Sequence, residues 1–379
     1  MKLSSWLSIS LAFLPVSLVA QAPHAGRVRT YYIAADEVVW NYAPQGTNVI
    51  AGRPFAGIEN LWTQRGPTQI GSSYKKALYR EYTDSTFRTL TPRPADQAYL
   101  GFLGPIIRAE VGDTIKVVFR NNATHPYSVH PHGVIYAKSS EGSPYNDGTS
   151  GADKADDGVM PGATYTYVWP VTERAGPAPG EGSSALWMYH SHVDEAKDVN
   201  AGLIGPLIVT ARGMARPDGS PKDVDQEIVT TFAELDENLS WYIDDNIQEY
   251  ALEPAKVQKA HGVTFTDPFG ITNLKETING YIFGNGPMPT MHIGDRVRWY
   301  VMSTTNFELH APHWHGNVVT ARHMKTDVLT LGTMGMIIAD MVPDNPGIWL
   351  FHCHIEPHNT AGMQMRFEVT PALARSGSR

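Results

Sequence analysis

The stretch WLFHCHIEPHNTAGM, residues 349–363, decides the fold of this 379-residue chain, because it sets a cysteine between two histidines at the end of an apolar run. Side chains alternate across a β-strand, so His352 and His354 should share one face while Cys353 points to the other. Cys353 is the chain's single cysteine and has no internal disulfide partner. Its thiol is therefore either buried and idle or a metal ligand.

The same pattern occurs earlier in the chain. WMYHSH at 187–192 matches WLFHCH at 349–354, and HPHG at 130–133 matches HWHG at 313–316. The stretches GPIIRAEVGDTIKVVF and GPMPTMHIGDRVRWYV precede the two histidine motifs at nearly equal distances. The chain is therefore predicted to contain a duplicated domain.

Short segments rich in β-branched and aromatic residues predict strands at 114–119, 164–169, 296–301 and 365–369. A short helix is expected within 241–254, ended by Pro254. Evenly spaced short strands in a repeat of this size favour two tandem Greek-key β-sandwiches. We expect domain 1 at 21–212, a polar linker at 213–226 and domain 2 at 227–379.

Residues 1–20 have an early lysine, an apolar run and a small residue at Ala20, which predicts a cleaved secretory signal peptide and a secreted protein. No later segment is apolar for long enough to span a membrane. The net charge of −8 gives no basic stripe for nucleic acid. Asn122 and Asn238 begin glycosylation sequons.

Ten of the fifteen histidines fall in four clusters at matching places in the two repeats. Two histidines and a cysteine with a distant methionine form the ligand set of a blue-copper electron-transfer site. Cys353, His358 and Met363 supply three of these ligands, and His310 is the natural fourth. A zinc site would need other ligand sets and would leave most of the histidines unexplained.

The other eight histidines form four His-x-His pairs, whose two imidazoles should each point to one face. Imidazole is a good copper ligand, and no second thiol accompanies the pairs, so the set suits three copper ions. The pairs are His130 and His132, His190 and His192, His313 and His315, and His352 and His354.

With these residues the chain resembles the multicopper oxidases, in particular the ceruloplasmin and hephaestin group, through YKKALYREYTDSTFRTL (74–90), LGFLGPIIRAEVGD (100–113), HSHVDEAKDVNAGLIGPLIV (190–209) and DENLSWYIDDNI (236–247). The resemblance implies cupredoxin-like domains and four coppers per active unit. Type 1 copper would be bound by His310, Cys353, His358 and Met363. Type 2 copper would be bound by His130 and His313, and the type 3 pair by His132, His190, His192, His315, His352 and His354.

Domain 1 departs from the type 1 pattern. Tyr127 stands where His310 stands, Ser191 where Cys353 stands and Leu203 where Met363 stands. This layout is similar to that of the small laccases, in which the three-copper cluster lies between domain 1 of one subunit and domain 2 of the next. The resemblance therefore implies a homotrimer, a cyclic assembly closed by heterologous contacts.

The reaction that the resemblance implies is four one-electron oxidations of a reducing substrate coupled to the reduction of O₂ to water. Electrons would pass through Cys353 to His352 and His354. Glu141, nine residues after His132, resembles an acid that small laccases place beside the cluster, where such groups orient ligands and tune bound water.

We expect the reducing substrate to be an organic phenol or aromatic amine, or alternatively Fe(II), which the resemblance to ceruloplasmin-like proteins implies. Pro357 stands where ceruloplasmin has an acid, and Ile271 and Glu276 stand where it has an acid and a histidine. Glu276 and Glu356 are the remaining candidate iron ligands. This erosion favours a laccase-like function over a ferroxidase.

Two further classes fit less well. Copper nitrite reductases are two-domain trimers but lack the type 3 pairs. The coagulation-factor A domains are non-enzymatic binding modules that have lost most copper ligands, whereas this chain keeps all of them.

Overall fold

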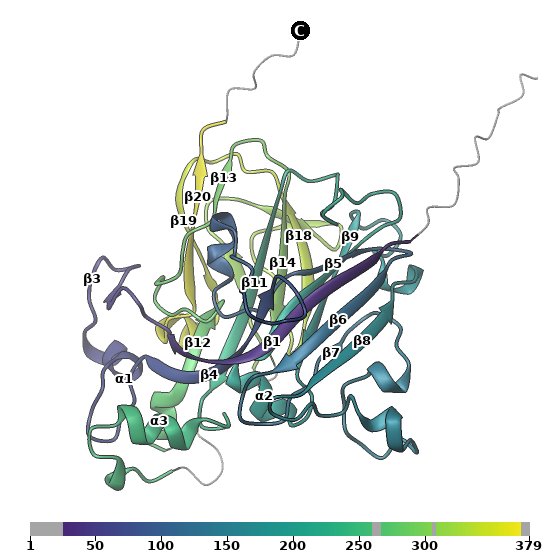
Figure 1. Ribbon diagram of the computed structural model, residues 1–379. Helices are drawn as coiled ribbons and strands as arrows, with labels where there is room; N and C mark the ends of the chain where they lie inside the picture. The colour runs from purple at the N-terminus through teal and green to yellow at the C-terminus, as the bar shows by residue number, and fades with distance from the viewer. Residues whose placement is uncertain (1–25, 260–266, 305–307, 373–379) are drawn as a thin grey trace, which may run out of the picture.

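The computed structural model describes residues 26–259, 267–304 and 308–372 (Figure 1). The predicted signal peptide lies outside these residues. In the part of the chain that is described, no helix is long and apolar enough to cross a membrane.

The first half of the chain folds into two four-stranded sheets. Parallel pairing of β1 with β6 and of β5 with β10 closes the long connections of a Greek key. In spatial order, one sheet holds β4 (Ser73–Tyr82), β1 (Val28–Asn41), β6 (Thr114–Asn121) and β8 (Thr164–Pro170), and the other holds β5 (Ile107–Glu110), β10 (Ile204–Thr210), β9 (Ser184–His190) and β7 (His130–Pro131).

The second half repeats this arrangement with two extra edge strands. In spatial order, one sheet holds β12 (Leu274–Ile278), β11 (Gln226–Asp236), β14 (Val297–Ser303), β18 (Met336–Met341), β16 (Val319–Ala321) and β17 (Met324–Thr326). The other sheet holds β13 (Thr290–His292), β20 (Gln364–Thr370), β19 (Gly347–Cys353) and β15 (Pro312–Trp314).

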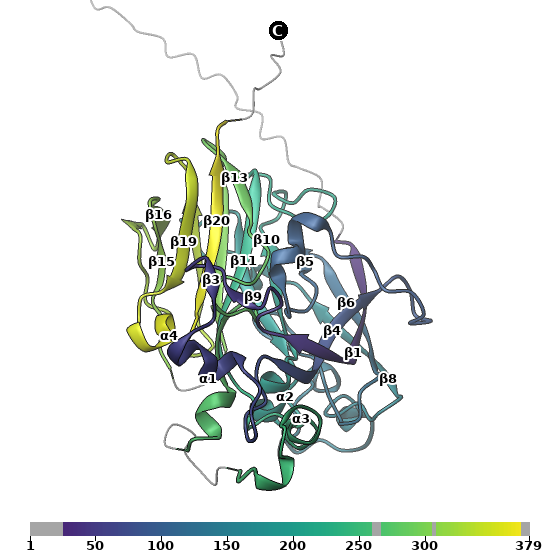
Figure 2. The same cartoon turned by 90° about the vertical axis from the view of Figure 1, so that its left-hand side faces the viewer.

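The two halves therefore have the same strand order. The order β4-β1-β6-β8 corresponds to β12-β11-β14-β18, and β5-β10-β9-β7 corresponds to β13-β20-β19-β15. Figure 2 shows the yellow strands β19 and β20 of the second half on the left and the blue and purple strands β6, β4 and β1 of the first on the right, with green and teal strands between them. The predicted all-β class, a tandem pair of Greek-key sandwiches, is confirmed.

The predicted local elements occur close to where the patterns place them. Strands β6, β8 and β20 cover three of the four predicted strands, and β14 begins one residue after the start of the fourth. The predicted short helix is α3 (Ile243–Tyr250), but it ends at Tyr250 and not at Pro254, which instead begins a 3-10 helix at Pro254–Lys256. The other helices are α1 (Asn60–Thr63), α2 (Glu195–Ala201) and α4 (Glu356–Thr360), and β2 (Thr47–Asn48) pairs with β3 (Arg53–Pro54) in a small hairpin. The predicted linker at 213–226 runs from β10 to the first residue of β11, and its limits stay a prediction.

The core of the second half explains how β15 and β19 hold their histidines. Trp314 and Phe351 are fully buried, and their ring centroids lie 4.9 Å apart. Trp299 packs on both rings, 5.7 Å from Trp314 and 5.0 Å from Phe351. Since neighbouring side chains alternate across a strand, packing of these rings turns the histidines on either side toward the opposite face.

A buried ion pair joins the two halves. Lys76 on β4 and Glu237, just after β11, are completely buried and hydrogen-bonded to each other. Lys76 also donates to the carbonyl of Asn200 at 2.7 Å, and Tyr42 donates to Glu237. Burial lowers the pKa of Lys76 and raises the pKa of Glu237, so both charges depend on their pairing.

We expect Lys76→Met to lower the free energy of unfolding by about 3–5 kcal/mol, because it leaves the Glu237 carboxylate buried without its cation. Urea denaturation of purified protein measures this loss. The double variant Lys76→Met/Glu237→Leu, which removes both charges, should recover most of the stability. Equal instability of the two variants would show that the pair acts through packing alone.

Candidate metal centres

The sulfur of Cys353 lies at the centre of a buried ligand cluster at the end of β19. It is 4.0 Å from Nδ1 of His310 and 3.5 Å from Nδ1 of His358. Ligands bound to one metal at roughly 2.0–2.3 Å lie roughly 3.5–4 Å apart in a trigonal set. Met363 is fully buried, and its carbonyl accepts from the Cys353 amide at 3.1 Å. The cluster therefore fits the predicted type 1 copper.

Burial favours the neutral forms of His310 and Cys353 in the absence of a cation. Burial, followed by His358, lowers the pKa of His310 to about 3, which leaves its imidazole neutral and able to donate a lone pair. Burial raises the pKa of the Cys353 thiol. The Ala311 amide donates to its sulfur at 3.3 Å and would support a thiolate once a cation is bound.

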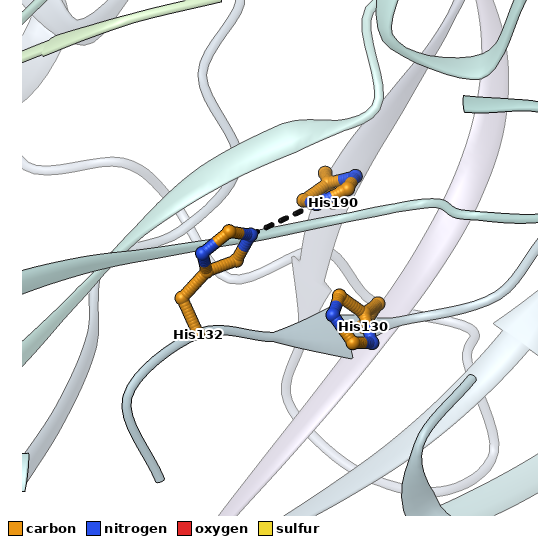
Figure 3. Close-up of side chains that lie close together, drawn as sticks. All are labelled: His130, His132 and His190. Carbon is orange, nitrogen blue, oxygen red and sulfur yellow. Dashed lines mark hydrogen bonds between the residues drawn. The ribbon is translucent and has the colours of Figure 1, made fainter. Parts of the chain in front are cut away.

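The first half of the chain brings three histidines together where β7 pairs with β9. His130 and His190 are direct partners in this pairing, and the ligand atoms of His130, His132 and His190 all lie within 4.8 Å of one another (Figure 3). Nε2 of His132 is 3.1 Å from Nε2 of His190. We call this group the first half-cluster.

The second half of the chain builds the matching group where β15 pairs with β19. His313 and His352 are direct partners, and the ligand atoms of His313, His315 and His352 also lie within 4.8 Å of one another. Nε2 of His315 is 3.0 Å from Nε2 of His352. We call this group the second half-cluster.

The protonation of these rings favours a cation between them. Nδ1 of His190 and of His352 lies within hydrogen-bond distance of a backbone carbonyl, at 3.1 and 2.8 Å, so that nitrogen carries the proton and Nε2 keeps the lone pair. Burial lowers the pKa of His132 and of His352 to about 4. Neutral rings with converging nitrogens fit copper.

The remaining members of the predicted copper set lie at the edge of the half-clusters. The His192 ring centroid is 5.1 Å from that of His130, and His354 is 5.1 Å from His313. Nε2 of His192 is 3.5 Å from the Glu195 carboxylate.

Glu141 touches the first half-cluster through its backbone. Its carbonyl oxygen accepts from Nδ1 of His130 at 2.6 Å, which leaves Nε2 of that ring free. Its carboxylate binds the Lys138 ammonium at 2.6 Å and accepts from the Tyr145 hydroxyl at 3.1 Å. The carboxylate that the sequence singles out is therefore held by Lys138.

A group of carboxylates lies beside the Cys353 cluster. Glu234 on β11 and Glu276 on β12 are direct partners across antiparallel strands, and both are buried. Glu308, two residues before His310, places its carboxylate 2.7 Å from Nε2 of His358. Ligand atoms of Glu234, Glu308 and His358 lie within 4.8 Å of one another. We call Glu234, Glu276 and Glu308 the carboxylate group.

Like charges directly opposite each other destabilise a sheet unless a proton or cation lies between them. Burial, followed by Glu234 and then Glu308, raises the pKa of Glu276 well above its ordinary value. The carboxylate group therefore favours a bound cation.

The sequence identified only one member of this group. Glu276 belongs to it, whereas Glu356 is exposed and accepts from Thr360 at 2.9 Å. Glu308 could have been found from its position beside His310. Glu234 could have been found as a charged residue in the apolar run of β11, but only the pairing of β11 with β12 shows that it faces Glu276.

Comparisons with known proteins agree with this geometry. Two sequence-family profiles, both described as multicopper oxidase, match residues 98–213 and 252–373. These spans contain both half-clusters and the Cys353 cluster. The chain belongs to the multicopper oxidase family.

Among its relatives in this family, human ferroxidase HEPHL1 is 45% identical over 90% of this chain and 29% of the relative. Mouse hephaestin is 41% identical over 92% of this chain and 30% of its own length. Rat ceruloplasmin is 42% identical over 90% of this chain and 32% of its own length. The chain spans about three tenths of the length of these relatives.

Two solved multicopper oxidase structures share the fold at 19% sequence identity. A protein described as a multicopper oxidase superposes with a TM-score of 0.56 over 92% of this chain and 94% of its own. The blue copper oxidase from Nitrosomonas europaea superposes with a TM-score of 0.54 over 91% and 86%.

We expect Cys353→Ser to abolish the intense blue absorption of the copper-loaded protein, because the hydroxyl cannot replace the thiolate ligand. Visible absorption and copper content measure this loss together. Glu356→Gln, at an exposed position on α4, the helix that carries His358, should keep the band. A blue band that survives in Cys353→Ser would contradict the assignment of this cluster.

Proposed function

We propose that this protein is a multicopper ferroxidase, which couples oxidation of Fe(II) to reduction of O₂ to water. The carboxylate group beside the Cys353 cluster carries this proposal. The relative HEPHL1 is itself named a ferroxidase, which also supports Fe(II) as the substrate. This proposal reverses the sequence-based expectation, which favoured a laccase-like function over a ferroxidase. Oxidation of phenols or aromatic amines becomes the second candidate.

The copper-binding roles follow the resemblance and the geometry. His310, Cys353, His358 and Met363 would hold type 1 copper. The half-clusters, with His192 and His354, would hold one type 2 and two type 3 coppers, which together supply the four-electron reduction of O₂. Cys353 follows His352 and precedes His354, so it links the type 1 ligands covalently to the second half-cluster.

The carboxylate group has the ligands that an Fe(II) substrate needs. Carboxylate oxygens are hard ligands, and they favour Fe(III) over Fe(II). At an effective dielectric constant of about 20, one more unit of positive charge gains about 4 kcal/mol from each carboxylate at ~4 Å. Three carboxylates therefore make loss of an electron from iron easier.

His358 joins the two sites. Its Nδ1 faces the Cys353 sulfur at 3.5 Å, and its Nε2 faces the Glu308 carboxylate at 2.7 Å. One imidazole ring thus separates the carboxylate group from the type 1 ligands, which gives a short path for an electron.

The second candidate has its own observation. Leu309, between Glu308 and His310, is 56% exposed. An apolar side chain at this place could contact an aromatic substrate next to His310.

We expect Glu234→Gln, Glu276→Gln and Glu308→Gln each to lower kcat/KM for Fe(II) by about 10- to 100-fold, because each removes a charged ligand. Oxidation of a phenol by the same variants should change little. Oxygen uptake with each substrate at one pH measures both values.

Glu356→Gln is the matched control, since this exposed carboxylate lies outside the group. It should oxidise Fe(II) as the unchanged protein does. Phenol oxidation that is faster than Fe(II) oxidation, together with unchanged iron kinetics in all three variants, would overturn the ferroxidase proposal in favour of the laccase-like one.

We propose that the active unit is a homotrimer. In the described residues, the histidines of each half-cluster come from one half of the chain, and the two half-clusters are separate groups. A complete set of copper ligands would therefore need a half-cluster from a second chain. About three chains of this length match one HEPHL1 or ceruloplasmin relative. Apolar side chains lie exposed beside both half-clusters, with Ile135 39% and Val328 38% exposed.

We expect Val328→Asp to dissociate the trimer, because a charge would be buried beside His313. The dissociated chain should lose type 2 and type 3 copper and keep the blue band. Light scattering and copper content measure both effects. Ile348→Asp is the control at the far end of β19, roughly 13 Å from His352 along the strand. A monomer with full copper content would contradict the trimer.

Secretion belongs to the proposal as well, since it rests on the predicted signal peptide and on no described residue. Glycosylation also stays a prediction. The Asn122 amide donates to Asp36 at 2.7 Å, and the Asn238 amide donates to Asp236 at 2.6 Å. A sugar on either residue would have to replace these contacts.

A further inference from the structure

The first domain contains a metal-free counterpart of the Cys353 cluster. The amide of Ser191 donates to the carbonyl of Leu203 at 3.1 Å, as the Cys353 amide donates to Met363. The Leu203 amide donates to the carbonyl of Asp198 at 3.1 Å, as the Met363 amide donates to His358 at 3.0 Å.

This hydrogen-bond register places Asp198 where the second domain has His358. We call Tyr127, Ser191, Asp198 and Leu203 the vacated site.

The vacated site is completely buried and filled with hydrogen bonds. All four of its side chains are 0% exposed. One carboxylate oxygen of Asp198 accepts from the Ser191 hydroxyl at 2.6 Å and from the amides of Val193 and Asp194 at 3.0 and 3.1 Å. These three donors flank His192 and follow His190.

Ser191 continues this network toward the other histidine strand. Its oxygen accepts from the Ser128 amide at 3.0 Å, as the Cys353 sulfur accepts from Ala311. The Ser128 hydroxyl accepts from the His192 amide at 3.0 Å and donates to the carbonyl of Gly142 at 2.6 Å. Serine and aspartate thus tie together the segments that carry the first half-cluster.

A segment of the second domain closes the vacated site. Trp241 and Tyr242 follow β11, and the Trp241 indole donates to the other oxygen of Asp198 at 2.8 Å. The hydroxyls of Tyr242 and Tyr127 lie 3.1 Å apart. Tyr127 and Asp198 stand in place of the type 1 histidines His310 and His358. They are therefore the residues through which the vacated site contacts Trp241 and Tyr242 of the second domain.

We propose that the vacated site is a socket for Trp241 and Tyr242, through which Asp198 and Ser191 position the histidines of the first half-cluster. Asp198 is a positioning residue: its carboxylate acts through Ser191 and the backbone amides of 193–194. This inference rests on the proposed copper-binding role of the half-clusters and adds the group that orients one of them.

Asp198→Asn tests the socket in the copper-loaded full chain. An amide offers one oxygen where the carboxylate offers two, so it cannot accept from both Trp241 and the donors around His192. We expect type 2 and type 3 copper to bind about 10- to 100-fold more weakly, as with other groups that orient metal ligands. The blue band of the second domain should be unchanged.

Two further measurements separate positioning from loss of folding. Trp241→Phe keeps a ring to stack on His125, which lies 4.6 Å away between centroids, and removes only the indole donor. It should weaken type 2 and type 3 copper in the same direction. In the copper-free protein, both variants should speed amide exchange at Val193 and Asp194.

Tyr31→Phe is the matched control, because it also removes hydrogen bonds in the first domain: the Tyr31 hydroxyl donates to the Arg108 carbonyl and accepts from the Arg108 amide, each at 2.8 Å. The socket proposal would be overturned if Asp198→Asn and Trp241→Phe showed the same copper binding and the same amide exchange as Tyr31→Phe. Failure of the unchanged protein to bind copper at the half-clusters would instead overturn the proposed function.

Discussion

The two-residue period of strand β19 is the constraint on which the metal centres depend. It sends Cys353 into the core with Phe351 and turns His352 and His354 the other way. One strand end therefore serves two sites on opposite faces, and the peptide bonds between these residues connect them. The aromatic packing of Trp299, Trp314 and Phe351 fixes which face is which, since a one-residue slip would exchange them.

Duplication supplied the second half of the copper-binding set and then allowed the halves to differ. Both domains keep the paired strands that carry His-x-His. Only the second has the side chains proposed to hold type 1 copper, and in the first their places are taken by side chains that hydrogen-bond to one another and to the second domain. The first domain therefore has buried polar side chains at this place, and they must satisfy their donors and acceptors internally.

Much of the fold and of the copper set could be predicted from the sequence. His-x-His pairs and strand patterns are local signals, and the internal repeat shows which of them correspond. The carboxylate group could not be predicted, because Glu234, Glu276 and Glu308 come from three separate segments. Only the antiparallel pairing of β11 with β12 brings the first two together, and the family's iron-site positions left Glu276 and Glu356 as candidates, of which only Glu276 belongs to the group. The Asp198 contacts were missed for a different reason: two extra residues between Ser191 and Asp198, relative to Cys353 and His358, hide the equivalence of Asp198 and His358.

The central claim is that the carboxylate group makes Fe(II) the preferred electron donor. The most direct test is to mix the oxidised, copper-loaded protein anaerobically with Fe(II) or with a phenol and to follow the loss of the blue band. The account predicts that Fe(II) bleaches the band much faster than the phenol at equal concentration, and that Glu276→Gln slows only the reaction with Fe(II). Faster bleaching by the phenol, with no effect of Glu276→Gln on either rate, would contradict it.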